Sequence, residues 1–421
     1  MSAETLQVQL DEMTAELIDR YEELTILYQL GAELASLFDV DDVCSIGLEK
    51  AVVATGATRA ILAIAEDAGL RVVASHGAQG LTSGGITDYV ATHGQELLLH
   101  EDEAAPDGTS RAGTDNGPVL SVPLLPPGGG LPLGALTLAA KADKARFTSG
   151  DAKLAGAVAN QVAAAVYRSR LAATLRTAVA VRREVEIAAG IQRSLLPGAP
   201  PDLPGVVLAA LCEPAANVGG DYYDYLVDGS GRLSLVIADV AGHSIGSALM
   251  MAMARSILRR EIAEGKHPSD VLAAANDTLF DDLVRAELFF TVFCARLDPA
   301  TGALEYANGG HNPPFVRRAG GLREELDGDG AAVGIMRDVV FERGATTLAA
   351  GDTLLLYTDG APEAVSPEGK QFGERRLQAE IGSEAPGQLV DSIFASVRAH
   401  AGGARQSDDI TLVAVQMVGS V

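Results

Sequence analysis

Four acidic clusters lie in the C-terminal half of the chain, each beside an apolar run typical of a strand or beside a glycine turn. Their leading residues are Asp221, Asp239, Asp359 and Asp408. Any one of them could be an ordinary turn residue, because Asp and Gly are the commonest loop formers. If the four converge, like charges crowd one site, which either raises the carboxyl pKa values strongly or requires cations between them.

The chemistry of these side chains restricts the kind of metal. Carboxylate oxygens favour hard divalent ions, Mg²⁺ or Mn²⁺, in octahedral geometry with several retained waters. An EF-hand calcium site is excluded because the acids are not packed into one loop of about 12 residues. A nucleotide-handling ATPase or kinase is disfavoured because the sequence has no Gly-x-x-x-x-Gly-Lys-Ser/Thr loop.

Each aspartate lies at an expected boundary of a strand. Asp239 ends the apolar run Leu233-Ser-Leu-Val-Ile-Ala, and Asp359 ends a similar run that starts after Asp352. Asp221 follows two glycines, which permit a tight turn with an exposed backbone. Asp408 opens the last predicted strand. An aspartate at a strand end, where the chain turns, is well placed to hold a cation.

The order of these clusters resembles the signature of the protein phosphatase 2C (PPM) superfamily, in its RsbU/SpoIIE-like bacterial branch. The resemblance rests on Gly219-Gly-Asp221-Tyr-Tyr-Asp, Asp239-Val-Ala-Gly-His, Thr358-Asp359-Gly, Asp408-Asp-Ile-Thr, Ile191-Gln-Arg-Ser-Leu-Leu-Pro197 and Tyr306-Ala-Asn-Gly-Gly-His311-Asn-Pro-Pro314. It covers about 190 to 418, with Ser244 standing where the family usually has glycine. All four expected aspartates are present, which argues against a degenerate pseudophosphatase.

The resemblance implies a metal-dependent protein serine/threonine phosphatase that uses two Mn²⁺ or Mg²⁺ ions. Asp239 would bridge both ions, and the Val240 carbonyl would assist at one of them. Asp221 would bind one ion, and Asp359 and Asp408 the other. Water held between the ions would attack phosphorus directly. The usual substrates of this branch are small phosphorylated anti-anti-sigma (STAS) proteins, which implies partner-switching control of transcription.

Four neighbouring residues keep alternative interpretations. Asp224 and Asp409 are either hydrogen-bond acceptors behind the metal ligands or solvated turn acids. His243 is either a general acid or, more commonly for such a residue, a partner of the turn backbone. His311 follows two glycines, and its loop would shape the site or a substrate groove. We assign neither histidine to catalysis.

The N-terminal half contains a second resemblance. Val119-Leu-Ser-Val-Pro-Leu-Leu, a glycine-rich turn, Leu133-Gly-Ala-Leu-Thr-Leu-Ala and Phe147-Thr-Ser-Gly-Asp resemble the closing hairpin and helix of a GAF sensory domain. GAF domains bind small ligands or simply dimerise, and no residue decides between these uses. Cys44, His93 and His100 form no chromophore or haem signature.

Two helical segments are expected outside the domains. Apolar residues from Leu6 to Leu27 step by threes and fours, interrupted by Arg20, which predicts either a short coiled coil or one amphipathic helix on the next domain. Residues 150–195 lack proline and predict one or two long helices that link the two halves. These helices would act as a spacer, or they would form a seam on a partner helix and give a homodimer, through Leu171, Leu175, Val179, Val185, Ala188, Gln192 and Leu195.

The expected architecture is α+β with several parts, since 421 residues exceed the roughly 250 to 300 of one core. We expect a coiled-coil-like helix at 1–30, a GAF-like α/β domain at 31–168, a helical linker and switch at 169–198, and an αββα phosphatase sandwich at 199–421. The GAF-like domain would sense a signal and pass it through the linker. The alternative is a non-catalytic sensor or scaffold with the same fold.

Composition limits the partners and the compartment. The formal charge is −24, from 32 basic and 56 acidic side chains, which disfavours nucleic acid and anionic membranes and suits basic partners or metal ions. The three cysteines lie far apart, and we expect buried thiols in a reducing cytosol. Without a basic, apolar leader or an apolar run of about 18 residues, we expect a cytoplasmic protein.

Overall fold

The computed structural model describes most of the chain. The described residues are Tyr21, Thr25, 27–77, 81–101, 103–106, 109–111, 114–115, 117–141, 145–242 and 244–419. Most of the predicted coiled coil at 1–30 therefore lies outside them, as does His243. Among the described residues, no helix combines the length and apolarity needed to cross a membrane.

The chain divides into two compact units, Met1–Val179 and Ala180–Val421. This division falls inside the expected linker at 169–198, but the domain boundaries drawn from the sequence remain predictions. Cys44 and Cys294 are buried, as expected, whereas Cys212 is only half-buried. Burial raises the pKa of all three thiols to about 12, so they are poor nucleophiles.

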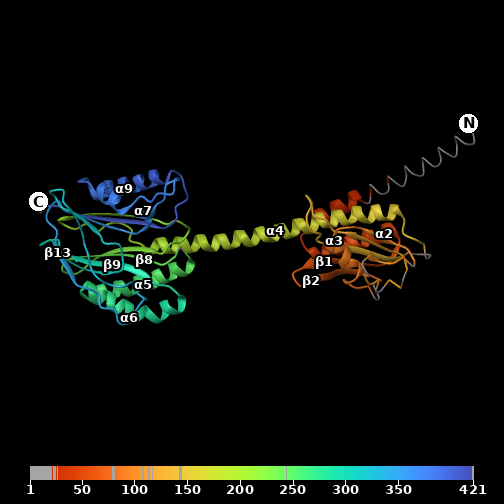
Figure 1. Cartoon of the computed structure of the whole chain (residues 1–421), viewed down its shortest axis with the longest axis horizontal. Coiled ribbons are helices and arrows are strands. Elements are labelled where there is room, and N and C mark those ends of the chain that lie inside the picture. Colours follow the sequence, from red (N-terminus) through yellow and green to blue (C-terminus); the bar gives the residue numbers. More distant parts are fainter. Residues whose placement is uncertain are drawn as a thin grey trace, which may run out of the picture. The chain divides into compact units, whose positions relative to one another are not determined.

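The first unit is built on a sheet flanked by helices (Figure 1). The five strands of this sheet are antiparallel and have the order β2-β1-β5-β4-β3. Its strands are β1 (Ala57–Glu66), β2 (Gly69–His76), β3 (Leu97–Leu99), β4 (Val119–Pro123) and β5 (Gly134–Lys141). Helices α2 (Val40–Thr55) and α4 (Ser149–Leu195) pack on one face and α3 (Ile86–His93) on the other. Alternate residues of β5 point to opposite faces of the sheet. Leu136 packs on the side of α2 and α4, and Ala135 packs on the side of α3.

Helix α4 continues from the first unit into the second as one helix of 47 residues and ends shortly before Pro197. Its early residues, including Val158 and Val162, are fully buried in the first unit. Further along, Leu171, Leu175 and Val179 are 50%, 57% and 66% exposed. The partner helix predicted along this seam remains a prediction.

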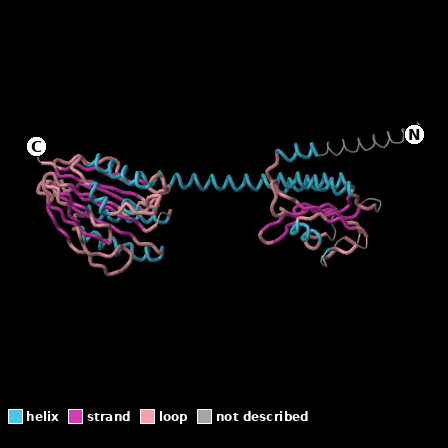
Figure 2. Tube along the Cα trace, turned by 45° about the horizontal axis from the view of Figure 1, so that its top comes forward, coloured by secondary structure: helices cyan, strands magenta, loops and turns pink. Residues whose placement is uncertain are grey.

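The second unit is a sandwich of two antiparallel sheets between helices (Figure 2). The first sheet has the order β13-β10-β9-β8-β7, from β7 (Asp221–Val227), β8 (Leu233–Val240), β9 (Phe290–Leu297), β10 (Ala303–Gly309) and β13 (Gly344–Thr347). The second has the order β12-β11-β14-β15-β6, from β6 (Val206–Glu213), β11 (Phe315–Arg317), β12 (Arg323–Glu325), β14 (Thr353–Tyr357) and β15 (Ile410–Met417).

Helices cover the outer face of each sheet, which confirms the predicted αββα arrangement (Figure 1). Helices α5 (Ile245–Ala263) and α6 (Pro268–Ala286) pack on the first sheet. Helices α7 (Gly360–Glu363), α8 (Glu374–Glu380) and α9 (Pro386–Ala401) pack on the second. A third group of buried residues fills the space between the two sheets.

Strand alternation aims the site residues into the space between the sheets. Leu235 and Ile237 of β8 pack there, so that Asp239, two residues further on, has the same orientation. Val413 of β15 packs there from the other sheet, and so Thr411 also faces inward. The inter-sheet core therefore ends in polar side chains at one end of the sandwich.

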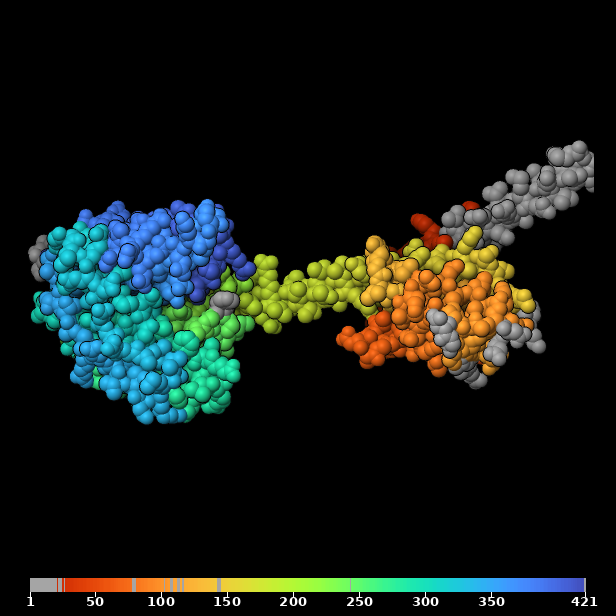
Figure 3. All heavy atoms as spheres, viewed as in Figure 1, coloured from red at the N-terminus to blue at the C-terminus, as the bar shows by residue number. Residues whose placement is uncertain are grey.

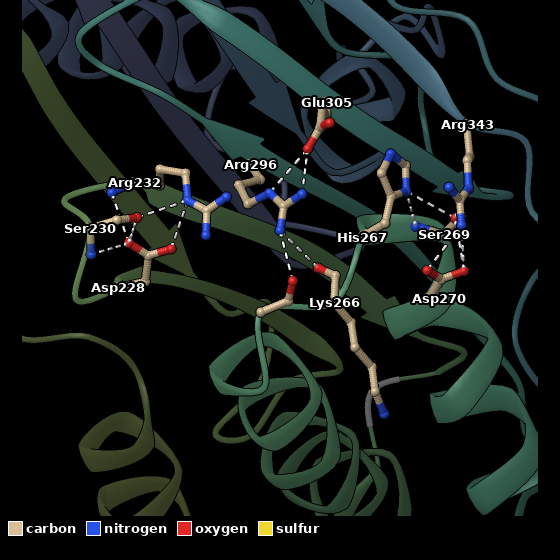
Figure 4. Close-up of polar contacts among 11 residues, drawn as sticks. Asp228, Ser230, Arg232, Lys266, His267, Ser269, Asp270, Arg296, Glu305 and Arg343 are labelled. Atoms are coloured by element: carbon tan, nitrogen blue, oxygen red, sulfur yellow. Dashed lines mark hydrogen bonds and ion pairs between the residues drawn. The ribbon is translucent and has the colours of Figure 1, made fainter.

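The other end of the first sheet carries a network of ion pairs (Figure 4). Asp228 and Arg232 pair at 2.9 Å in the turn between β7 and β8. In the same region Arg343 pairs with Asp270 at 3.0 Å, and Arg296 donates to Glu305. Val227 pairs with Leu233 in the β-ladder, whereas Asp221 pairs with Asp239. These arginines thus lie at the strand ends away from the candidate site.

Candidate active site

The two sheets each contribute two of the four predicted aspartates at the same end of the sandwich. Asp221 opens β7 and lies directly opposite Asp239 of β8 in the antiparallel register. Asp359 follows β14 at the start of α7, and Asp408 lies just before β15. Strands β14 and β15 are neighbours in the second sheet. Residues from four separate stretches of sequence therefore meet there.

Asp221 is held by hydroxyl groups from the opposite sheet. Its side chain is 4% exposed, and its Oδ2 accepts hydrogen bonds from Thr358 Oγ1 at 2.8 Å and from Thr411 Oγ1 at 2.6 Å. Burial, followed by the charge of Asp239, raises the pKa of Asp221 well above its usual value. The hydroxyl groups of Thr358 and Thr411 thus hold in place a carboxylate whose burial is costly.

The remaining carboxylates interact with one another. Burial raises the pKa of Asp239 to about 8, and the charges of Asp359, Asp408 and Asp409 contribute to the rise. Burial and the neighbouring Asp408 also raise the pKa of Asp359. Crowded carboxylates of this kind favour a bound proton or a bound cation, because either relieves their mutual repulsion.

Asp409 is a buried acceptor rather than a solvated turn acid. It is 2% exposed, and its Oδ1 accepts from the Ala215 amide at 2.8 Å while its Oδ2 accepts from the Gly220 amide at 2.7 Å. It thereby holds the loop that leads into Asp221. Burial raises the pKa of Asp409 in spite of these hydrogen bonds, which lower it.

Asp224 is also buried, at 1% exposed, but it serves the packing of α5. Its carboxylate accepts from Tyr222 Oη and from Arg259 Nη1, both at 2.6 Å. The solvated-turn alternative is therefore wrong for Asp224 as well as for Asp409. Asp224 points away from the inter-sheet space, because Tyr222 packs against α5 and α6 and alternate residues share a face.

The glycines before Asp221 are required by close backbone approach. A Cβ atom on Gly220 would lie 2.2 Å from the Val240 carbonyl oxygen and 3.0 Å from Asp239 Oδ1. A Cβ atom on Gly219 would lie 2.1 Å from Asp409 Oδ2. Only glycine lets this turn pass so close to two carboxylates and a carbonyl.

Comparison with known families agrees with both resemblances. Residues 229–418 match the family model of stage II sporulation protein E (SpoIIE), and residues 22–166 match that of the GAF domain. The chain carries a GAF domain and a SpoIIE domain. Asp239, Asp359 and Asp408 fall within the matched SpoIIE residues, whereas Asp221 lies shortly before them.

Two curated relatives each match just over half of the chain. Protein IcfG of Synechocystis sp. is 33% identical over 263 residues, which cover 56% of this chain and 41% of IcfG. Phosphoserine phosphatase RsbU of Bacillus subtilis is 30% identical over 222 residues, which cover 52% of this chain and 65% of RsbU. The chain thus matches less than two thirds of the length of either relative.

A solved structure has the fold of the SpoIIE domain. The SiaA-PP2C domain of Pseudomonas aeruginosa superposes with a TM-score of 0.51 at 22% sequence identity, over 57% of this chain and 98% of that domain. The match confirms the predicted phosphatase-type fold, and at this identity it describes the fold alone.

Gln192 of α4 connects the helix to the site, a role that the sequence did not predict. Its Nε2 donates to the Gly219 carbonyl at 2.6 Å, and its Oε1 accepts from the Gly219 amide at 3.1 Å. Gln192 was expected only as a member of the helical seam. Its place in the Ile191-Gln-Arg-Ser-Leu-Leu-Pro197 motif was the available signal, but the partner could not be deduced from the motif.

A cavity of about 350 Å³ lies between this end of α4 and the site. Gln192 and Arg193 line it from the helix, and Asn217, Asp221 and Asp409 line it from the SpoIIE domain's strands and loops. The carboxylate of Asp221 can therefore be reached from this side, although it is almost fully buried.

His311 is a buried connector between strands. Its Nε2 lies 3.1 Å from the Tyr357 carbonyl, which can only accept, so Nε2 carries the proton. Its Nδ1 then accepts from Thr291 Oγ1 at 2.8 Å. Burial lowers the pKa of His311 to about 4, so it is neutral near pH 7. It secures the end of β14, two residues before Asp359, rather than acting as an exposed acid.

Proposed function

We propose that this chain is a metal-dependent phosphatase of phosphoserine or phosphothreonine proteins, regulated by its GAF domain. The observation that carries the proposal is the meeting of Asp221, Asp239, Asp359 and Asp408 at one end of the sandwich. Phosphomonoester hydrolysis is among the slowest uncatalysed reactions, needing accelerations up to roughly 10²¹-fold. Carboxylates crowded in this way suit such a reaction when cations neutralise them.

The carboxylate and carbonyl oxygens of these residues are donors of the kind that Mn²⁺ and Mg²⁺ prefer, and the proposal places two such ions here. Asp239 would bridge the ions with help from the Val240 carbonyl, Asp221 would bind one ion, and Asp359 and Asp408 the other. Bound divalent ions supply a nucleophilic water at neutral pH and neutralise phosphate oxygens. Among the described residues, no three acidic, His or Cys side chains already stand at the spacing of metal ligands. The carboxylates would therefore have to draw together on binding.

Hydrogen bonds and close packing by the surrounding residues position the carboxylates of this site. Thr358 and Thr411 occupy Oδ2 of Asp221, which leaves Oδ1 for a ligand. Asp409 holds Gly220, whose missing side chain leaves room for the Val240 carbonyl and for Asp239 Oδ1. The low-dielectric setting strengthens every charge interaction at the site.

The proposed substrate is a small phosphorylated anti-anti-sigma (STAS) protein. Support comes from RsbU, which is named a phosphoserine phosphatase and shares 30% identity over 222 residues with this chain. The GAF domain would bind an unidentified signal, or none, and α4 would transmit the change through Gln192. The exposed Leu171, Leu175 and Val179 support a homodimer through α4. The proposed compartment is the cytoplasm.

A phosphate-release screen of the full chain with Mn²⁺ against phosphorylated STAS proteins tests this function. We expect release from at least one of them and none with the chelator EDTA present. A chain that binds a STAS protein but never releases phosphate would instead be a non-catalytic scaffold.

A further inference from the structure

A second cavity of about 360 Å³ also lies next to the candidate site, within the SpoIIE domain. It is a groove between the start of α7, the end of α9 and the loop before β15, and we call it the α9 groove. Its lining includes Gly360, Ser366, Arg398, Arg405, Gln406 and Ser407. Figure 3 shows the C-terminal part of the chain, in blue, as a continuous part of this domain's surface.

The α9 groove opens beside the aspartates. Gly360 directly follows Asp359, and Ser407 directly precedes Asp408. Gln406 fixes the wall between the groove and the site, because its Nε2 donates to the carbonyls of Glu213 and Asp408, both at 2.8 Å. A protein segment that placed a phosphorylated residue at the aspartates could lay its neighbouring residues in this groove.

Two arginines give the groove its charge. Arg398 and Arg405 are exposed, and neither forms an ion pair with any residue that the structure describes. Arg398 lies 5.7 Å from the centre of the Phe394 ring, which steadies its guanidinium. Glu213 is the acid among the lining residues. By contrast, Arg232, Arg296 and Arg343 at the far end of the first sheet are all neutralised by neighbouring acids (Figure 4).

The α9 groove differs in charge from the chain as a whole and from the cavity beside α4. The chain has a net charge of −24, and the cavity beside α4 is lined by Glu186, Glu213, Asp221 and Asp409 with Arg193 as its cation. An acidic segment would be repelled from that cavity and attracted to the α9 groove. Arginine suits this task because its planar fork binds carboxylates through two parallel hydrogen bonds.

We propose that the α9 groove binds an acidic segment of the phosphoprotein substrate, next to its phosphorylated residue. The proposal rests on the proposed phosphatase function and adds a source of substrate specificity. Charges at such a rim select partners and speed their association more than they add affinity. Their effect is therefore expected to weaken as salt is added.

Peptide binding tests the groove separately from catalysis. The probes are a fluorescein-labelled phosphoserine peptide with glutamates on both sides of the phosphoserine, and the same peptide with glutamines. Fluorescence anisotropy gives Kd for each peptide with the full chain, and phosphate release is measured in parallel. The variants are Arg398→Gln with Arg405→Gln, and, as a charge-matched control on α8, Arg375→Gln.

We expect the unmodified chain to bind the glutamate peptide roughly fivefold more tightly than the glutamine peptide, as for one or two exposed ion pairs. The double variant should lose this preference, and Arg375→Gln should keep it. The proposed binding of an acidic segment in the α9 groove is refuted if the unmodified chain shows no preference for the glutamate peptide. It is also refuted if the preference survives in the double variant. A preference that depends on the two arginines but comes without phosphate release would support peptide binding in the α9 groove and refute the proposed phosphatase function.

Discussion

Adding one methyl group at Gly220 should disable the site with little effect on the fold. In Gly220→Ala the new Cβ would start 2.2 Å from the Val240 carbonyl oxygen, whereas ordinary contacts begin at 3.4 Å. The turn and the carbonyl must therefore separate by about 1.2 Å, the difference between these two distances. A displacement of about 1 Å at a reacting centre can cost on the order of 100-fold in rate, or about 2.7 kcal/mol.

The matched control is Gly229→Ala, in the turn between β7 and β8. A Cβ atom there meets nothing within 4 Å, so the same chemical change has no steric consequence. Mn²⁺-dependent phosphate release and Mn²⁺ binding by calorimetry should both fall in Gly220→Ala and stay unchanged in Gly229→Ala. Thermal unfolding checks the fold, where overpacking costs typically about 1–3 kcal/mol. An unaltered rate of phosphate release and an unaltered Mn²⁺ affinity in Gly220→Ala would refute the close approach of Gly220 to the Val240 carbonyl. They would also refute the role of this carbonyl as a metal ligand.

Two further changes test the connections to the site. Gln192→Leu removes both hydrogen bonds to Gly219, worth about 1–3 kcal/mol together; phosphate release should fall several-fold, and the exposed Ser194→Ala control should not reproduce the loss. His311, with a pKa of about 4 when folded and about 6.5 when unfolded, binds its proton more readily in the unfolded chain. Its contribution to the free energy of unfolding is thus fully present above pH 6.5 and declines by about 3 kcal/mol as the pH falls to 4. Urea unfolding between these pH values should show that this component is absent from His311→Gln; an identical pH dependence in both proteins would show that His311 does not titrate as its burial implies.

Local sequence predicted the elements that carry the acids. The run Leu233-Ser-Leu-Val-Ile-Ala is apolar apart from Ser234 because β8 lies between β7 and β9 and is covered on both faces, with Ile237 facing the other sheet and Val236 facing the helices. An aspartate after such a run must lie at a strand end. The glycine pair before Asp221 likewise indicated a close approach of the backbone.

Contacts between distant residues could not be predicted in the same way. Thr411 reaches Asp221 across 190 positions of sequence, and only the packing of the two sheets brings them together. A threonine in a strand is ordinary, so nothing local marks it as a partner of a buried acid. The same holds for Asp409 and Gln192, whose partners belong to a loop that neither strand pattern nor helical periodicity describes.

Several predictions made from the sequence stay predictions. Most of the predicted coiled coil at 1–30, and His243, lie outside the described part of the chain. Asp239 as a bridge between two ions, the dimer through α4 and the GAF ligand depend on partners that local patterns cannot specify. Each is decided by binding experiments rather than by further geometry.

Hydrolysis of p-nitrophenyl phosphate by the full chain, with Mn²⁺ and with Asp239→Asn as the comparison, tests the central claim most directly. The variant keeps the size of the side chain and removes the charge that would bridge the ions. We predict Mn²⁺-dependent hydrolysis by the unmodified chain and its loss, by roughly 100-fold or more, in Asp239→Asn. Hydrolysis that needs no divalent ion, or that persists undiminished in Asp239→Asn, would contradict a metal-dependent phosphatase built on these aspartates.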